Sequence, residues 1–258
     1  MDSGAPGTDA TTKLPRAGFW RRWLAILIDG IIVMFPFQIL AAVLFAMTAG
    51  MIQMDSGFFS SCDAASSIPQ DLNPPPPHDS NFAQVCHVTL LGWPTGATLT
   101  VGRVTREGAA TTTVSQGYML DRHGTPINGT SIDWIVELVF IAYLVGMVWK
   151  TGQTLGAGIV GVRVIDTANP SISGIPLRKV IVRYLAMIIG ALPAFALLIY
   201  QRTAVGGSAD AMFIGDFFRW FALAGVLGAL WVLLLIVQIA RKSDPVYDRL
   251  AGTAVVRD

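Results

Sequence analysis

Ionisable residues fall within long apolar stretches of this chain. Asp29 and Arg183 lie inside two such stretches, and Glu137 and Arg219 lie near the ends of two others. An ionisable side chain in hydrocarbon costs roughly 2.5–3.5 kcal/mol on insertion scales, so it normally has a partner or a task. A carboxylate in such a setting can take up and release a proton or hold a cation, which makes ion relay the first chemistry to consider.

The spacing of these residues predicts which of them meet. Arg22 precedes Asp29 by seven residues, so both side chains project from one face of a helix. Arg183 is expected at a similar depth on another helix, which predicts an Asp29–Arg183 or an Asp29–Arg22 pair. Nearer the opposite surface, Glu137 and Arg219 are expected at comparable depth and form a second predicted pair.

Two interpretations of these charges stay open. In the first, Asp29 and Glu137 are titrating carboxylates of a proton or cation relay, on opposite sides of the membrane. In the second, the charges only hold and orient the helices, with Arg22, Asp133 and Arg219 reaching out to water. Asp133 shares a helix face with Glu137 at the i, i+4 spacing. The sequence favours neither interpretation for Asp29, and it favours the structural one for Asp133 and Arg219.

The chain has two cysteines, Cys62 and Cys86, and both lie in one polar segment. If that segment is extracytoplasmic, a disulfide between them is expected. Zinc binding together with His78 and His87 is the rival, but cysteines 24 residues apart lack the close C-x2-C spacing of zinc sites. We therefore expect a disulfide and no metal.

The elements that must position these residues are membrane helices. Hydrophobic residues make up 53% of the 258 residues and charged residues only 14%, which does not suit a soluble surface. A net charge of +1 argues against a nucleic-acid partner. A hydrocarbon core about 30 Å thick needs roughly 20 apolar residues of helix. Four stretches satisfy this requirement, at 24–50, 132–149, 180–200 and 217–240.

The distribution of charge predicts the orientation of these helices. Basic residues gather before the first stretch, between the second and third, and after the fourth, whereas residues 53–131 hold three arginines against six acidic residues. By the positive-inside rule, both termini are cytoplasmic. The expected segments are a disordered cytoplasmic N-terminus at 1–19, transmembrane helices at 20–50, 131–149, 180–200 and 217–240, an extracytoplasmic insert at 51–130, a cytoplasmic glycine-rich loop at 150–179, an extracytoplasmic loop at 201–216 and a cytoplasmic tail at 241–258.

The insert is expected to form a small antiparallel sheet. Residues 88–91, 97–104 and 111–118 are rich in threonine and valine and are separated by glycine and proline turns. The run Pro74 to Pro77 predicts an extended spacer inside the disulfide loop. Residues 121–124 are expected to form a surface turn.

The glycine-rich loop formally contains G-x-G-x-x-G at Gly156, Gly158 and Gly161. A dinucleotide site needs a strand before this motif and a helix after it, whereas here a membrane helix precedes it and a strand-like stretch follows. We instead expect a short interfacial helix, then a strand at 162–165 that pairs with residues 253–256. That pairing places Asp248 and Arg249 near enough to reach Arg22 or Arg163. The predicted fold is an all-α membrane protein, a four-transmembrane-helix bundle with a small β-rich extracytoplasmic insert and a short cytoplasmic strand pair.

Three blocks carry a resemblance to a known family: RWLAILID at 22–29, GQTLG at 152–156 with GVRVID at 161–166, and YDRLAGTAVV at 247–256. Together they resemble the RDD family of membrane proteins, named for an arginine and two aspartates. Carried over, the arginine is Arg22 and the aspartates are Asp29 and Asp248. Ala157 departs from the basic residue common at that place in the family. The insert is not part of the usual pattern, so no role is inherited for it.

The resemblance implies a suspected role in transport, with monovalent cation/proton exchange attributed to some members, and a bacterial plasma membrane. We therefore expect a transporter of a small solute or monovalent cation, in the bilayer as a homo-oligomer or with a membrane-protein partner. The alternative is a non-catalytic accessory or scaffold protein whose insert binds an envelope partner. No nucleophile motif such as G-x-S-x-G and no H-E-x-x-H zinc motif is present, so we expect no enzyme and no cofactor.

Overall fold

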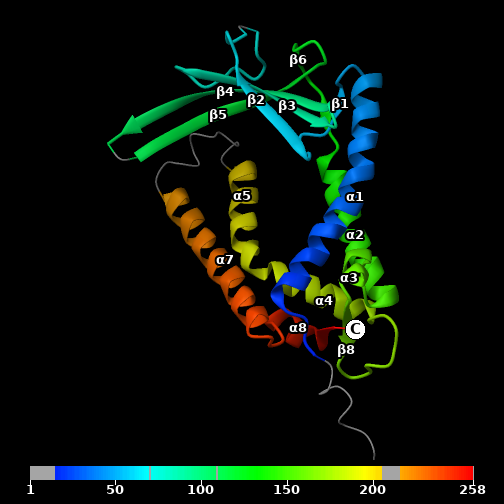
Figure 1. Cartoon of the computed structure of the whole chain (residues 1–258). Coiled ribbons are helices and arrows are strands. Elements are labelled where there is room, and N and C mark those ends of the chain that lie inside the picture. Colours follow the sequence, from blue (N-terminus) through cyan, green and yellow to red (C-terminus); the bar gives the residue numbers. More distant parts are fainter. Residues whose placement is uncertain (1–14, 70, 109, 205–215, 258) are drawn as a thin grey trace, which may run out of the picture. The chain divides into compact units, whose positions relative to one another are not determined.

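The computed structural model describes residues 15–69, 71–108, 110–204 and 216–257, and it divides into two compact units (Figure 1). One unit comprises Met1–Ile31 and Phe140–Asp258, and the other comprises Ile32–Val139. Most of the predicted disordered N-terminus, and of the loop predicted at 201–216, lies outside the described residues.

Four helical segments of the described residues are long and apolar enough to cross a membrane: Phe19–Met47, Asp133–Thr151, Leu177–Tyr200 and Phe217–Ala240. They correspond to helix α1 (Phe19–Met47), helix α2 (Asp133–Thr151), helices α4 (Leu177–Ile188) and α5 (Leu192–Ala204) together, and helix α7 (Asp216–Ala240). The four predicted stretches are thus confirmed, with their ends shifted by a few residues. Large apolar side chains such as Leu27, Leu138 and Leu230 are exposed on them, as lipid-facing side chains are.

The third span is not one continuous helix. A 3-10 turn, η2 (Ile189–Ala191), separates α4 from α5, and Pro193 lies in the first turn of α5, where its missing N–H is tolerated. A Cβ atom added at Gly190 would meet Trp231 of α7 at 2.5 Å. The Trp231 indole N–H also donates to the Met187 carbonyl at 3.1 Å. The interruption therefore lets α7 pack closely against the backbone of the third span.

Two short strands and two short helices complete this unit. Strand β8 (Val162–Asp166) pairs antiparallel with strand β9 (Thr253–Arg257), so that Val164 lies opposite Val255. Helix α3 (Leu155–Ile159) precedes β8, and helix α8 (Val246–Ala251) precedes β9. Gly252 separates α8 from β9 with φ 63°, a left-handed conformation that glycine adopts without strain. The short helix and the strand pair predicted from the sequence are confirmed.

The segment before α1 also joins this strand pair, which the sequence did not predict. The Ala17 N–H donates to the Val255 carbonyl at 3.0 Å, and the Arg257 N–H donates to the Pro15 carbonyl at 2.9 Å. Ala17 is fully buried against Val162 and Val255. The residues just before α1 and those of β9, which are far apart in the sequence, are therefore held together in this unit.

The other unit holds an antiparallel sheet of five strands. Its strands run in the order in which they occur along the chain: β2 (Phe59–Ala64), β3 (Phe82–Leu90), β4 (Trp93–Glu107), β5 (Ala110–Leu120) and β6 (Pro126–Ile127). Strands β1 (Ile52–Gln53) and β7 (Thr130–Ser131) pair in parallel. The three predicted strands are confirmed and are longer than expected, whereas β2 was not predicted. The all-α class is too narrow for a chain with this much sheet.

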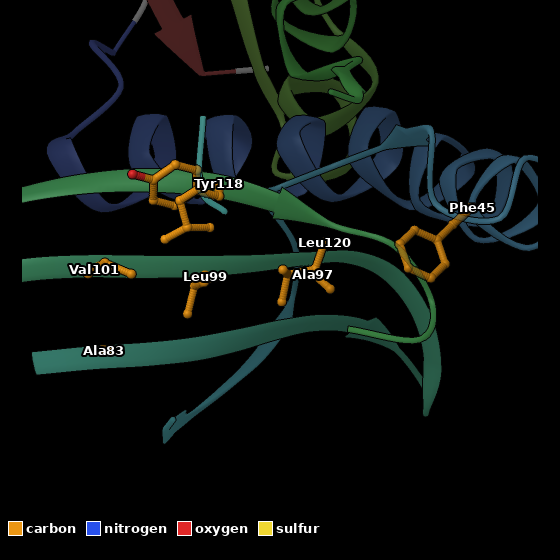
Figure 2. Close-up of a cluster of buried hydrophobic side chains, with 8 residues drawn as sticks. Phe45, Ala83, Ala97, Leu99, Val101, Tyr118 and Leu120 are labelled. Carbon is orange, nitrogen blue, oxygen red and sulfur yellow. The ribbon is translucent and has the colours of Figure 1, made fainter. Parts of the chain in front are cut away.

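Alternation along the strands builds the core of this sheet (Figure 2). Ala97, Leu99 and Val101 of β4 point to one face and pack with Tyr118 and Leu120 of β5. Leu72, from the segment between β2 and β3, is buried in the same cluster, and the Tyr118 hydroxyl donates to the Pro74 carbonyl at 2.8 Å. The segment around the proline run forms no helix or strand. It lies over the face of the sheet that carries this buried cluster.

Cys62 and Cys86 form the expected disulfide. They lie directly opposite each other in the β2–β3 register, so the bond cross-links two neighbouring strands. The surface turn expected at 121–124 is also present, with the Asp121 carboxylate accepting from the N–H groups of His123 at 2.7 Å and Thr125 at 2.8 Å.

Candidate functional site

Asp29 is almost completely buried in α1, at 1% exposure. One carboxylate oxygen accepts from the Tyr143 hydroxyl at 2.7 Å and from the Gly156 N–H at 2.7 Å. The other oxygen accepts from the Thr154 hydroxyl at 2.5 Å. Three donors from α2, from α3 and from the residue that caps α3 therefore converge on this one carboxylate.

The glycine-rich block explains how α3 reaches Asp29. Thr154 is the N-cap residue of α3, and its hydroxyl oxygen also accepts from the Ala157 N–H at 3.1 Å. The N–H groups of a first helical turn lack partners within the helix and readily meet a carboxylate. A Cβ atom at Gly156 would lie 2.2 Å from the Ala25 carbonyl oxygen. Only a glycine at this position lets α3 approach the backbone of α1 so closely.

The predicted pairing of Asp29 with Arg22 or Arg183 is wrong. Hydroxyl and amide donors of the GQTLG block and α2 surround Asp29, and both arginines contact Asp248 instead. Depth and helical spacing put these charges near one another but could not tell which carboxylate each arginine would meet. The threonine and glycine of the GQTLG block were a signal for the Asp29 contacts that the analysis of charges alone missed.

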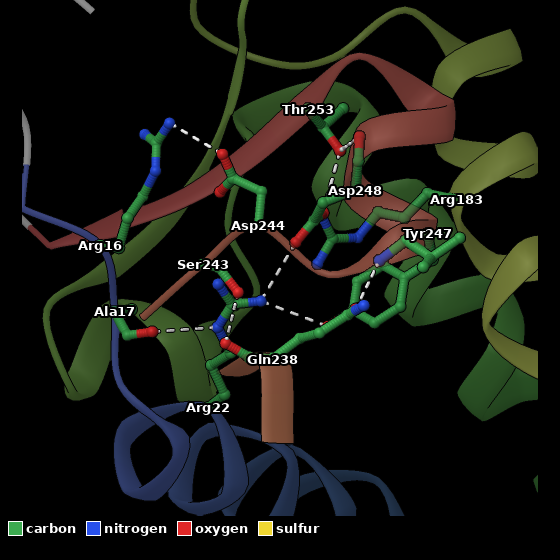
Figure 3. A network of polar contacts seen from close by, with 11 residues as sticks. Arg16, Ala17, Arg22, Arg183, Gln238, Ser243, Asp244, Tyr247, Asp248 and Thr253 are labelled. Carbon is green, nitrogen blue, oxygen red and sulfur yellow. Dashed lines mark hydrogen bonds and ion pairs between the residues drawn. The ribbon is translucent and has the colours of Figure 1, made fainter. Parts of the chain in front are cut away.

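Asp248, on α8, lies between two arginines (Figure 3). It is 0% exposed. The Arg22 guanidinium donates to one carboxylate oxygen at 3.1 Å, and the Arg183 guanidinium contacts the other. The Thr253 hydroxyl also donates to the second oxygen, at 3.0 Å. The predicted reach of Asp248 to Arg22 is confirmed, and Arg183 belongs to the same cluster.

Tyr247 completes the surroundings of the two arginines. Its hydroxyl accepts from Arg22 at 3.2 Å, and the Arg183 guanidinium carbon lies 5.1 Å from the centre of its ring. Arg22 also donates to the Ala17 carbonyl at 3.2 Å. Two positive charges and one negative charge thus share a site with little water, and removing the negative charge would leave both arginines uncompensated.

The second predicted pair stays a prediction. Glu137 and Arg219 lie in different units, and both are exposed. Asp133, one turn before Glu137, accepts from the backbone N–H groups of Asp55 at 2.9 Å and Ser56 at 3.2 Å. These contacts support the structural interpretation of Asp133, which fixes the chain before β2 to the first residue of α2.

A buried glutamine in α1 lies beside the same segment and was not predicted to be important. Gln38 is 0% exposed, and its amide donates to the Ser56 carbonyl at 2.6 Å.

Among the described residues, no three His, Cys, Asp or Glu side chains gather where they could hold a metal ion. The two cysteines are joined to each other and are not available as ligands.

A third charged contact ties β8 to the start of the third span. The Lys179 ammonium group donates to the Asp166 carboxylate at 2.6 Å, and the Ala168 N–H donates to the same oxygen at 2.9 Å. Burial alone would raise the pKa of Asp166, but these hydrogen bonds and the charge of Lys179 hold that pKa below its ordinary value.

Comparison with known proteins gives one match. A family model described as the RDD family matches residues 109–252, which is more than half of the chain. The match includes Arg183, Asp248 and the GQTLG block, whereas Arg22 and Asp29 lie before it. No curated protein and no solved structure matches.

Replacing Gly156 by alanine is expected to lower the stability of the protein by about 1–3 kcal/mol, because the added methyl group would clash with the Ala25 carbonyl and displace α3 from Asp29. Gly158→Ala is the matched control, since it lies in the same helix and its Cβ would have nothing closer than 3.9 Å. Thermal unfolding in detergent micelles measures both. Equal stability of the two variants would contradict the close approach of α3 to α1.

Stability should also depend on Asp166 with a defined sign. Because the pKa of Asp166 is lowered in the folded protein, its contribution is complete above the ordinary value of 3.8 and is lost as pH falls through the folded pKa. The stability difference between wild type and Asp166→Asn should therefore be largest near neutral pH and shrink below about pH 4. Unfolding midpoints from pH 3 to pH 7 measure it, with the exposed Asp71→Asn as control; a constant difference would count against the Asp166–Lys179 pair.

Proposed function

This chain belongs to the RDD family of membrane proteins, and we propose that it moves a small solute or a monovalent cation across the membrane, coupled to protons. The observation that carries the proposal is the setting of Asp29. It is a carboxylate at 1% exposure inside a membrane span, and its partners are two hydroxyl groups and one amide rather than a cation. A carboxylate without a fixed counter-charge in such a place can exchange its charge for a bound proton or a bound cation.

The proposed coupling runs from Asp29 to the GQTLG block. When ionised, Asp29 is a strong acceptor for the Thr154 hydroxyl and the Gly156 N–H, and these bonds hold α3 against α1. Protonation removes the negative charge and weakens both bonds. In the proposal, uptake of a proton or a cation by Asp29 therefore changes how firmly α3 is held, and this links the charge of the site to the position of a loop between two spans.

The orientation and assembly are part of the proposal. Both termini face the cytoplasm, because the basic residues flank the spans on that side, and the membrane is the plasma membrane of a bacterium. Four spans are few for alternating access, which generally uses a larger repeated bundle. The protein therefore works as a homo-oligomer or together with a membrane-protein partner in this proposal. No catalytic role is assigned to any residue.

The test is ion-dependent proton exchange in proteoliposomes at matched protein levels. Wild type is expected to exchange protons for at least one monovalent cation, and Asp29→Asn is expected to lose this exchange because it cannot ionise. Tyr143→Phe removes one hydrogen bond to Asp29 but no charge, so it should keep measurable exchange with an altered pH dependence. Glu137→Gln tests the second carboxylate of the predicted relay.

The possible results separate transport from the alternative function. Loss of exchange in Asp29→Asn, with unfolding behaviour like that of wild type, supports a carboxylate relay. Wild-type protein that exchanges no monovalent cation, and variants that change only stability, would overturn the proposal. The accessory or scaffold function would then be preferred, in which the insert at 51–130 binds an envelope partner and the membrane charges are structural.

A further inference from the structure

A pocket of about 430 Å³ opens beside the first turn of α1, within the unit formed by Met1–Ile31 and Phe140–Asp258. Four cationic side chains line it, from the segment before α1, from α1, from the turn after α7 and from β9: Arg16, Arg21, Lys242 and Arg257. Phe19 and Trp20 also line it, so aromatic and cationic groups share one concave surface.

The positive charge of this pocket is not balanced within the described part of the chain. Arg16 forms an ion pair with Asp244 at 2.9 Å, and the second terminal nitrogen of Arg16 and the second oxygen of Asp244 are both buried without a hydrogen-bond partner. Arg21 donates to the Val160 carbonyl, an uncharged group, at 2.8 Å. One carboxylate therefore faces four cations, and Asp258 lies outside the described residues. An excess of positive charge that lines one pocket attracts an anionic group from outside the chain.

The location of the pocket indicates what kind of acceptor it meets. The span of α1 begins at Phe19, and the span of α7 ends at Ala240. The pocket therefore lies where these two membrane-crossing segments leave the hydrocarbon. Trp20 is 74% exposed and Trp23 is 49% exposed, as aromatic residues at a membrane–water interface are. The groups present in bulk at this depth are lipid headgroups, and guanidinium groups match phosphate oxygens in shape and charge.

We propose that this pocket binds the phosphate of an anionic phospholipid headgroup. Arg16 and Arg21 hold the phosphate, Lys242 and Arg257 add long-range attraction, and Trp20 lies against the glycerol and upper acyl region. The bound headgroup would reach α1, the end of α7 and β9 together. This site is separate from Asp29 and does not depend on the transport proposal.

Native mass spectrometry of the purified full chain tests the proposal by counting bound lipids during titration with phosphatidylglycerol, phosphatidylcholine or inorganic phosphate. The test variant is Lys242→Ala/Arg257→Ala, because neither side chain has a partner among the described residues. The control is Arg178→Ala/Arg249→Ala, which removes the same charge from two exposed residues outside the pocket. Size-exclusion profiles and unfolding midpoints confirm that both double variants are folded.

Wild type is expected to bind phosphatidylglycerol in preference to phosphatidylcholine. The test variant should lose about 25-fold in affinity for phosphatidylglycerol, at about fivefold for each of the two basic side chains, whereas the control should change less than about threefold. Equal losses in both variants would overturn the proposal in favour of diffuse attraction. Inorganic phosphate that displaces the lipid at equal concentration would overturn the lipid as ligand and assign the pocket to free phosphate.

Discussion

Asp248 neutralises two arginines that come from two different membrane spans. Arg22 lies in α1 and Arg183 lies in α4, and both guanidinium groups are buried against the same carboxylate. Charges in a place with little water must be paired, so neither span can keep its arginine there unless α8 brings Asp248 to it. The tail of the chain is therefore held to the spans by an electrostatic requirement rather than by apolar burial alone.

The position of the tail in turn fixes the two-stranded sheet. Gly252 ends α8, and β9 begins at the next residue, where Thr253 also donates to Asp248. β9 then pairs with β8, and the segment containing Ala17 pairs with β9 on its other side. Arg22 donates to the Ala17 carbonyl, so the segment that pairs with β9 also contacts the charged cluster. The cluster thus contacts the sheet at Thr253 of β9 and at Ala17.

The two aspartates that resemble the family pattern differ in their partners. Asp248 has two cations and is suited to holding elements together. Asp29 has hydroxyl and amide donors only, and through α3 it contacts the loop between two spans. A charge without a fixed counter-charge is free to respond to a proton or a cation. This difference is the physical reason for proposing that Asp29 takes part in transport and that Asp248 holds the elements together.

The sequence predicted most elements and fewer contacts. Apolar length predicted the four spans, and alternating valines predicted β8, β9 and the long strands of the insert. Strand β2 was missed because Phe59–Ala64 is exposed throughout and its residue types do not alternate between apolar and polar. The Asp29 partners were missed because they are uncharged: the hydroxyl groups of Tyr143 and Thr154, and the backbone N–H of Gly156, do not enter a search for opposite charges. The close approach of Trp231 to Gly190 joins distant segments, which no local pattern reveals.

The pairing of Asp248 with its arginines can be tested by a double-mutant cycle on Arg183 and Asp248. Unfolding free energies would be measured in micelles for Arg183→Gln, for Asp248→Asn and for the double variant. Asp248→Asn alone is expected to cost about 3–5 kcal/mol, because it leaves two buried cations. The double variant should be more stable than the sum of the single effects predicts, by more than about 1 kcal/mol. Additive effects would contradict the view that this carboxylate holds the tail to the spans.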